Sequence, residues 1–375
     1  MEFVDVGLLA GERSRRATVA PFAELRKLPR VEITDQLKLI EEPANIQRLQ
    51  TLVAAGHALV PVTRRAPTDH LMHRKDFPRR FLFEMTSECN VLCRMCPRNH
   101  LLRPTKHIDT ELYLKGVSEI NSHGVDGLWL YYLGESLMHP DFRKIVRFLE
   151  GMTDIRTLWF STNGHLMNES NIKFILDSRI TFLNYSLNAT TAETYKFVDP
   201  KGDFAIVLDN YRRLAGHKRA RRGTPPFLRL QMVEQENTVH EIQEFLERFY
   251  HEVDIISVNM LEYANLPMNQ FGKTQDRPRE MPGYCSRLRD NRAIITADGA
   301  MTLCDFAYNT DERFVGEHFL GNIRDQSIYD IWNGERRRKL LELESACRLK
   351  EVDLCRGCTD FDISRPTVTG GAKAP

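Results

Sequence analysis

The sequence lacks an excess of charge of either sign, and it lacks any long hydrophobic run. The 52 Lys and Arg residues are balanced by 51 Asp and Glu residues, which leaves a formal net charge of +1. This balance does not predict binding to nucleic acid or to an anionic membrane. No segment reaches the roughly 18 uninterrupted apolar residues of a membrane span. We therefore expect no membrane association and no nucleic-acid partner.

The N-terminus also lacks the order of residues found in a secretory signal. Its first residues, MEFVDVGLLAGERSRR, place acidic side chains before a short apolar run, the reverse of a signal peptide. We expect a cytoplasmic protein. In such a reducing compartment, the eight cysteines are more often metal ligands or catalytic groups than disulfide partners.

With 375 residues and 42% hydrophobic content, the chain can bury one large core and a smaller second unit. Changes in sequence pattern predict an N-terminal extension at 1–78, a main domain at 79–280, a second domain at 281–360 and a disordered tail at 361–375. The extension suggests one amphipathic helix near residues 46–53. It is a candidate leader-binding unit for a precursor peptide, but it lacks a convincing set of strands for adding a peptide to a sheet edge.

The main domain alternates short apolar runs with segments of helical period. The six expected strands lie at residues 81–86, 127–132, 157–162, 181–187, 227–233 and 255–260. Strands that alternate with helices predict an α/β fold with a parallel sheet, here a partial (β/α)6 barrel. Active sites of such folds form at the C-terminal ends of the strands.

Three cysteines, Cys89, Cys93 and Cys96, lie within eight residues directly after the first expected strand. A loop this compact can surround one metal centre. Three thiolates on a [4Fe-4S] cluster leave the fourth iron without a protein ligand, so that a small molecule can bind there. The alternative is a zinc site of Cys₃His type completed by His100.

The CxxxCxxC pattern in this position resembles the signature of the radical S-adenosylmethionine (radical SAM) superfamily. The resemblance implies a [4Fe-4S] cluster that reductively cleaves S-adenosylmethionine to a 5′-deoxyadenosyl radical, with a flavodoxin- or ferredoxin-type electron donor. It also implies cofactor contacts at the ends of the second, third and fourth strands. These residues are Gly134 and Glu135, which resemble part of the family's GGEP motif, then Ser161 and Asn163, and finally Ser186 and Asn188.

A second set of cysteines, Cys285, Cys304, Cys355 and Cys358, has the spacing C-x18-C-x50-C-x2-C. Four thiols fit either a structural zinc site or a fully ligated iron–sulfur cluster. Together with the segment 320–333, this set resembles the SPASM/twitch domains that follow radical SAM barrels. Because only four cysteines are present, the resemblance implies the shorter twitch form with one auxiliary [4Fe-4S] cluster.

Within this second domain, the pair Asp298-Gly299 predicts a hairpin, and residues 327–346 predict one helix. Cys347 follows that helix and belongs to neither cysteine set. Free cysteines commonly pack as small apolar residues. The alternatives are an additional auxiliary ligand or a hydrogen-atom donor of the kind used by radical SAM epimerases, which is our one candidate for a catalytic residue.

The substrate is the least determined feature. Polar residues interrupt otherwise apolar strands and are candidates to face the barrel interior; they are Glu84, Arg229, Gln231, Asn259 and Glu262. The leading hypothesis is oxidation of a carbinol in a polar small molecule, such as an aminocyclitol or sugar in natural-product biosynthesis, because known twitch enzymes include such dehydrogenases.

Three other functions remain open. One is maturation of a ribosomal precursor peptide by cross-linking or epimerisation, with a peptide as substrate. The second is a redox-neutral dehydration, epimerisation or decarboxylation of a sugar or nucleoside. The third is a zinc-stabilised binding protein without catalytic activity.

Overall fold

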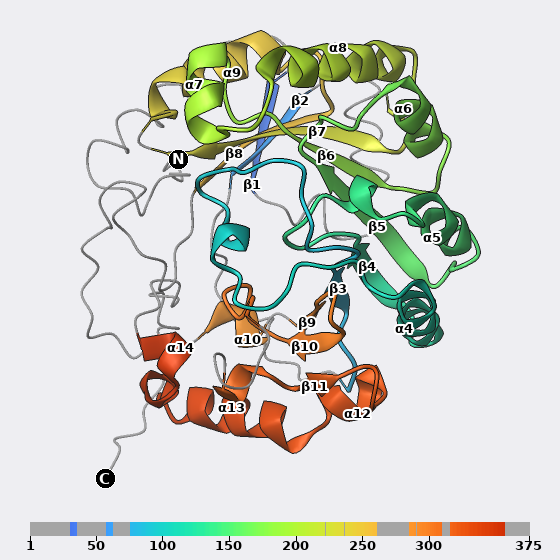
Figure 1. Cartoon of the computed structure of the whole chain (residues 1–375), viewed down its shortest axis with the longest axis vertical. Helices are drawn as coiled ribbons and strands as arrows, with labels where there is room; N and C mark the ends of the chain where they lie inside the picture. Colours follow the sequence, from blue (N-terminus) through green and yellow to red (C-terminus); the bar gives the residue numbers. More distant parts are fainter. Residues whose placement is uncertain are drawn as a thin grey trace.

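A single curved sheet organises the computed structural model, which describes residues 31–35, 58–62, 76–221, 223–235, 237–260, 285–289, 291–309 and 316–356. The sheet has eleven strands in the order β1-β2-β8-β7-β6-β5-β4-β3-β9-β10-β11. Strands from the extension, the main domain and the second domain therefore share one hydrogen-bonded layer (Figure 1).

The central six strands confirm the predicted barrel. They are β3 (Arg80–Phe83), β4 (Val125–Trp129), β5 (Ile155–Thr162), β6 (Phe182–Ser186), β7 (Phe227–Glu234) and β8 (Ile255–Met260). Each pairs in parallel with its neighbour. The crossover segments carry the helices α4 (Thr110–Ser122), α5 (Phe142–Leu149), α6 (Glu169–Leu176), α7 (Ala192–Val198), α8 (Phe204–Ala220) and α9 (Ile242–Phe249).

These helices lie on the outer side of the curved sheet, whereas the long loop after β3 lies on the inner side (Figure 1). Alternate strand residues point to the helices and form the main core, for example Phe83, Phe160 and Leu230. The residues between them point inward. Several helices start at side-chain caps, as in α4, where Asp109 accepts a hydrogen bond from the Leu112 amide.

The inward face begins with an apolar layer. Its members are Leu82, Trp129, Trp159, Phe182, Phe227, Ile255 and Ile294. Aromatic rings stack across neighbouring strands, with Trp159 and Phe182 centroids 4.0 Å apart. This layer fills the interior at one level of the strands and excludes water there.

The second domain continues the sheet beyond β3. Strand β9 (Arg292–Ile295) pairs in parallel with β3, and β10 (Ala300–Thr302) returns antiparallel to β9. The predicted hairpin at Asp298-Gly299 is confirmed, and Gly299 has a φ of +85°, which favours glycine. Strand β11 (Gly321–Asn322) completes this edge. The domain limits stay a prediction, since residues 261–284 are not described.

The prediction of a single helix over residues 327–346 is wrong about the number of helices. The structure has two helices, α12 (Ile328–Trp332) and α13 (Glu335–Ser345), with Gly334 at the N-cap of the second. Glycine disfavours a continuous helix because it gains the most backbone entropy on unwinding. Shorter helical segments complete the domain; they are α10 (Ser286–Arg289), η7 (Gly316–His318), η8 (Leu349–Glu351) and α14 (Asp353–Arg356).

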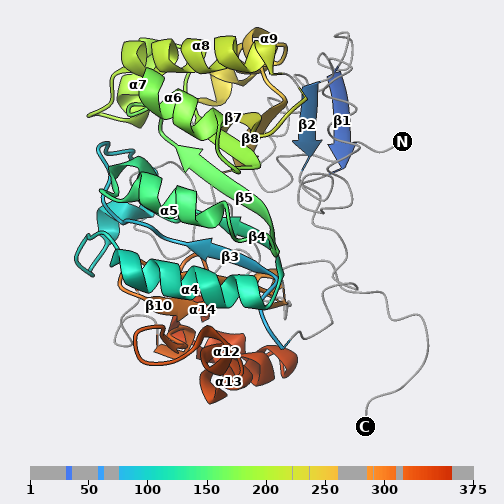
Figure 2. The same cartoon turned by 90° about the vertical axis from the view of Figure 1, so that its right-hand side faces the viewer.

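The extension contributes two strands, although its sequence shows no convincing set of strands. Strand β1 (Val31–Asp35) pairs with β2 (Ala58–Val62), and β2 pairs with the barrel strand β8, all in parallel. Figure 2 shows both strands beside the barrel. The expected helix at 46–53 and the tail at 361–375 lie outside the described residues.

No helix in the parts of the chain described above combines the length and the apolar character needed to cross a membrane.

Candidate active site

The loop that carries Cys89, Cys93 and Cys96 begins soon after β3, at the C-terminal end of the barrel strands. Two contacts attach it to the end of α7: the Leu92 amide donates to Asp199 Oδ1 at 3.0 Å, and the Arg94 amide donates to the Val198 carbonyl at 2.9 Å. The Cys96 amide donates to the Cys93 carbonyl. The loop is thus held by a hydrogen bond within its own turn and by hydrogen bonds to the end of α7.

All three thiols are partly shielded from water. Burial raises the pKa of Cys89 to about 11, and it also raises the pKa of Cys93 and Cys96. The neighbouring thiols contribute, since the charge of each disfavours ionisation of the next. Iron that binds such sulfurs removes their protons and supplies the compensating positive charge. The donor set therefore fits an iron–sulfur cluster.

Within the described ranges, no three His, Cys, Asp or Glu side chains converge closely enough to hold a single metal ion. The zinc alternative needs Cys89, Cys93, Cys96 and His100 at about 2–2.3 Å from one ion. A cluster of four irons separates its thiolates over the corners of a larger cube. The two alternatives therefore differ in how closely the thiols must approach one another.

Gly134 brings the loop after β4 against the first-cluster loop. A Cβ on this residue would lie 2.1 Å from the Thr86 carbonyl oxygen and 2.6 Å from that of Glu88. The next residue, Glu135, donates its amide to the same Glu88 carbonyl at 2.9 Å. Only glycine allows the two backbones to approach this closely.

Glu135 is buried and joins two strand ends. Its Oε2 accepts from the Asn163 amide at 2.8 Å and from Thr162 Oγ1 at 3.1 Å, and its Oε1 accepts from the Leu137 amide. Burial raises the pKa of the carboxyl to about 7, although these hydrogen bonds oppose the shift. Glu135 therefore positions the third strand end beside the cluster loop.

Asn163 is a predicted cofactor residue that contacts the cysteine loop. Its Nδ2 is 3.6 Å from Cys89 Sγ and donates to Asn90 Oδ1 at 2.8 Å. Ser161, two residues earlier, faces the barrel interior and accepts from Asn184 Nδ2 at 2.9 Å. The structure thus brings both residues of this strand end to the inner face.

At the end of the fourth barrel strand, β6, the two predicted cofactor residues make different contacts. Ser186 Oγ lies 3.5 Å from Asn184 Nδ2 on the inner face. Asn188 is buried, and its Oδ1 accepts from the Val233 amide at 3.0 Å. That oxygen links the ends of β6 and β7, which is a structural task. The cofactor roles of both residues stay predictions.

Above the apolar layer, the inner face becomes polar. Positions two residues further along the strands carry Glu84, Ser161, Asn184, Arg229, Ser257 and Thr296. Arg229 donates to Ser257 Oγ at 2.9 Å and to Asn259 Oδ1 at 3.1 Å. This layer lies at the same end of the strands as the cysteine loop. Of the strand residues predicted to face inward, Glu262 lies outside the described residues.

The second cysteine set is described in three of its four members. Cys304 and Cys355 are buried and Cys285 is partly buried; Cys358 lies outside the described residues. His318 Nε2 lies 3.1 Å from Cys355 Sγ, with both side chains buried. The ligand assignment stays a prediction.

Cys347 is exposed and follows the last turn of α13 with a φ of +57°. Its amide donates to the Glu344 carbonyl, as at a helix C-terminus. A hydrogen-atom donor must reach a radical that is shielded from water, so this exposure gives the catalytic role no support.

Sequence reasoning missed two residues that shape the site, Asp199 and Asn184. Asn184 is a polar residue inside an apolar strand, which is a usable signal. Asp199 gave none, because its role depends on contact with a loop 107 residues away in the sequence.

Residues 83–253 match the radical SAM superfamily, and residues 285–359 match the SPASM iron–sulfur cluster-binding domain. The chain carries both domains. Together they imply a [4Fe-4S] cluster, S-adenosylmethionine and an auxiliary iron–sulfur cluster. Whether the second domain is the shorter twitch form stays a prediction.

Several known proteins resemble this chain. A tungsten-containing aldehyde ferredoxin oxidoreductase cofactor-modifying protein from Pyrococcus furiosus is 25% identical over 296 residues, which span 68% of this chain and 80% of the relative. A GTP 3',8-cyclase from Chlorobaculum tepidum is 24% identical over 147 residues, 39% of this chain and 43% of the relative.

Two solved structures share the fold. BtrN, in complex with AdoMet and 2-DOIA, is 18% identical with a TM-score of 0.50, and the match covers 78% of this chain and 96% of BtrN. SuiB from Streptococcus suis, bound to S-adenosylmethionine, is 15% identical with a TM-score of 0.56, covering 76% of this chain and 72% of SuiB.

Proposed function

We propose that this radical SAM protein oxidises a carbinol of a polar small molecule, such as an aminocyclitol or a sugar, in natural-product biosynthesis. The supporting observation is the polar layer on the inner face of the barrel, close to the end that carries Cys89, Cys93 and Cys96. Its amide, hydroxyl and guanidinium groups suit a ligand rich in hydroxyl or amino groups. BtrN, which shares the fold, is described in complex with 2-DOIA.

When bound, the first cluster would supply one electron to S-adenosylmethionine, which splits into methionine and a 5′-deoxyadenosyl radical. That radical would take a hydrogen atom from the carbinol carbon, and a base would take the hydroxyl proton. One further electron must leave the substrate to give the carbonyl product, and the auxiliary cluster is the acceptor we propose. The apolar layer would keep water away from a substrate bound at the polar layer next to it.

The test uses anaerobically reconstituted protein with aminocyclitols and polyols deuterated at the carbinol carbons. We expect deuterium in 5′-deoxyadenosine and a product that has lost one deuterium and one hydrogen relative to the labelled substrate, read by mass spectrometry. The Cys89→Ala/Cys93→Ala/Cys96→Ala variant is the control and should give neither. Deuterium transfer with a product at unchanged redox state would contradict the oxidation and favour the redox-neutral reaction.

A precursor peptide is a second candidate substrate, favoured by strands β1 and β2. Strand β1 is the last described strand at its edge of the sheet, and a peptide can bind by adding a strand to such an edge. SuiB is also described bound to its precursor peptide SuiA. Hydrogen transfer from labelled peptides, and from none of the polyols, would select this function.

A further inference from the structure

Two loops that follow cysteines of the two sets are hydrogen-bonded to each other. We define residues 97–103, after Cys96, as the first arm, and residues 304–309, which begin at Cys304, as the auxiliary arm. The Leu102 amide donates to Asn309 Oδ1 at 2.6 Å, and Asn309 Nδ2 donates to the His100 carbonyl at 3.2 Å. The arms are thus joined through both groups of one amide side chain.

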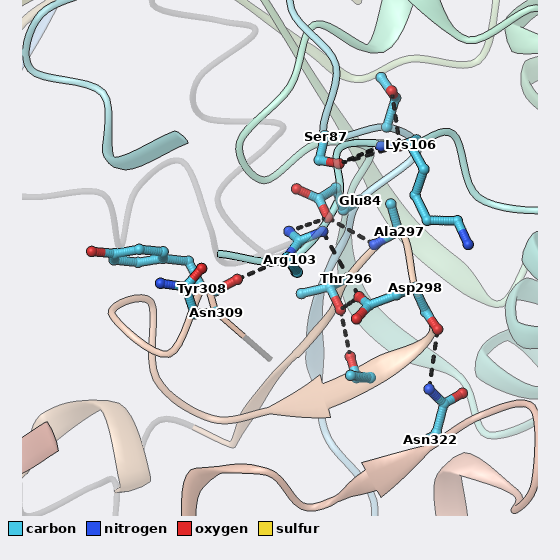
Figure 3. A network of polar contacts seen from close by, with 12 residues as sticks. Glu84, Ser87, Arg103, Lys106, Thr296, Ala297, Asp298, Tyr308, Asn309 and Asn322 are labelled. Carbon is cyan, nitrogen blue, oxygen red and sulfur yellow. Dashed lines mark hydrogen bonds and ion pairs between the residues drawn. The ribbon is translucent and has the colours of Figure 1, made fainter. Parts of the chain in front are cut away.

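Arg103 makes the most buried of these connections. Its Nε donates to the Tyr308 carbonyl at 2.8 Å, and its Nη2 donates to Glu84 Oε2, also at 2.8 Å. The exposed fractions of the two charged side chains are 4% for Arg103 and 0% for Glu84. One arginine thus links the end of β3 with the auxiliary arm (Figure 3).

Glu84 extends the connection to the hairpin of the second domain. The same Oε2 accepts from the Ala297 amide at 2.7 Å, and Asp298 Oδ1 lies 3.8 Å from Arg103 Nη1 (Figure 3). The Glu84 carboxylate therefore binds both Arg103 of the first arm and the Ala297 amide of the hairpin. Because the Glu84 amide, directly after β3, also donates to the Ile295 carbonyl of β9 at 2.8 Å, Glu84 fixes the level at which the two domains meet.

A third contact holds the auxiliary arm directly after its cysteine. Tyr132 Oη, from the loop after β4, donates to the Asp305 carbonyl at 2.5 Å. The Asp305 carboxylate accepts from Arg287 and Arg292. The residue next to Cys304 is therefore held from the barrel and from its own domain.

A buried ion pair such as Glu84–Arg103 is a weak source of folding stability, because desolvation of both charges offsets their attraction. Its better-attested use is to select one arrangement among similar ones. A misplaced arm would leave a buried charge without its partner, which is strongly unfavourable. The pair thus favours one relative position of the two arms.

We propose that Glu84 and Arg103 are positioning residues that set the separation between the first and the auxiliary cluster. This inference rests on the cysteine assignments used in the proposed function, and on no choice of substrate. Electron transfer between a substrate at the barrel and the auxiliary cluster would then occur over a distance that this pair maintains.

The test compares reconstituted wild type with the variant Glu84→Gln/Arg103→Met, which removes both charges together so that neither stays buried alone. The matched control is Glu111→Gln/Lys144→Met, which removes an ion pair whose side chains are 76% and 55% exposed. Hydrogen exchange of residues 304–309 is measured by mass spectrometry. The magnetic interaction between the two reduced clusters is measured by electron paramagnetic resonance.

We expect exchange in the auxiliary arm to become at least about tenfold faster in the Glu84/Arg103 variant, with exchange in α5 and α6 unchanged. The interaction between the clusters should weaken while the g-values of each cluster persist. The control should match wild type. If the double variant does not fold, Tyr132→Phe provides the same measurement with one hydrogen bond removed, and faster exchange confined to the arm is expected there.

Unchanged exchange and an unchanged magnetic interaction would overturn the proposal. Because exchange requires no turnover, failure of every tested substrate would defeat the proposed reaction without affecting this result.

Discussion

At the scale of single residues, Gly134 offers a sensitive test of the first-cluster site. In Gly134→Ala, the added methyl group would overlap the backbone oxygens of Thr86 and Glu88, neither of which can move without shifting the cysteine loop. We expect loss of most S-adenosylmethionine cleavage and reduced iron content. Both are measured after anaerobic reconstitution.

Gly216 supplies the control for that substitution. It lies inside α8, and a Cβ there would meet nothing within 4 Å. Gly216→Ala should therefore leave cleavage unchanged and stabilise the chain by about 0.5–1 kcal/mol. Equal losses in the two variants would contradict the role given to Gly134.

The raised pKa of Glu135 predicts that the free energy of unfolding depends on pH. Its pKa is about 7 in the folded chain, above the value of an exposed glutamate. The folded state therefore binds more protons than the unfolded state between pH 4.5 and 7, and the contribution of Glu135 to stability is present below this range and lost as the pH rises through it. The whole effect is on the order of 3 kcal/mol.

Urea unfolding of the cluster-free chain across this pH range measures the effect. Glu135→Gln, which stays neutral and keeps a similar shape, should reduce the fall in stability with rising pH. The same slope in both proteins would show that the carboxyl ionises normally.

Cys347 tests a different point. With a φ of +57° at the end of α13, a glycine should be preferred by roughly 1 kcal/mol. We expect Cys347→Gly to raise the unfolding temperature and to leave iron content and deuterium transfer unchanged. Loss of product formation with intact clusters would instead support the hydrogen-donor role.

At the scale of elements, the barrel could be predicted because its strands are short apolar runs that alternate with helical periods. Each of the six expected segments overlaps one of the strands β3 to β8, although their ends differ by up to three residues. The break between α12 and α13 could also have been read from Gly334, since glycine interrupts a helix. Strands β1 and β2 could not. Strand β1 pairs with β2, and β2 pairs with β8, so both depend on the folded barrel, and each has only five residues.

The extension strands carry a prediction of their own. Strand β2 covers the β8 edge of the barrel, and an uncovered edge can pair with another chain. Removal of residues 1–75 should therefore give concentration-dependent oligomers with a normal content of iron in the first cluster. Light scattering during gel filtration measures this, and a monomer at all concentrations would contradict it.

At the scale of the whole molecule, the two-domain match predicts two clusters in one chain. Reconstituted protein should hold about eight irons, and the Cys89→Ala/Cys93→Ala/Cys96→Ala variant about four, with S-adenosylmethionine cleavage abolished. Iron and sulfide assays measure this. Stoichiometric zinc without cleavage would contradict the enzyme.

The grouping of Cys89, Cys93 and Cys96 in one loop at the end of the barrel strands was predictable from their compact spacing directly after a strand, whereas their role as cluster ligands stays a prediction. The contacts between the domains were not predictable. Arg103 and Asn309 are ordinary surface-type residues in the sequence, and their roles appear only when distant loops meet. Polar groups of this kind are recognised from partners, which local sequence does not contain.

The strand order of the sheet also affects the sequence in which parts of the chain fold. Strand β3 is the first barrel strand in the sequence, yet one of its two neighbours is β9, and Glu84 meets Ala297 across 213 residues. Such non-local pairing forms late because a long loop must close first. During synthesis, the first three cysteines therefore emerge well before β9 can pair beside them. This leaves an interval in which a carrier could deliver iron and sulfide to an open loop.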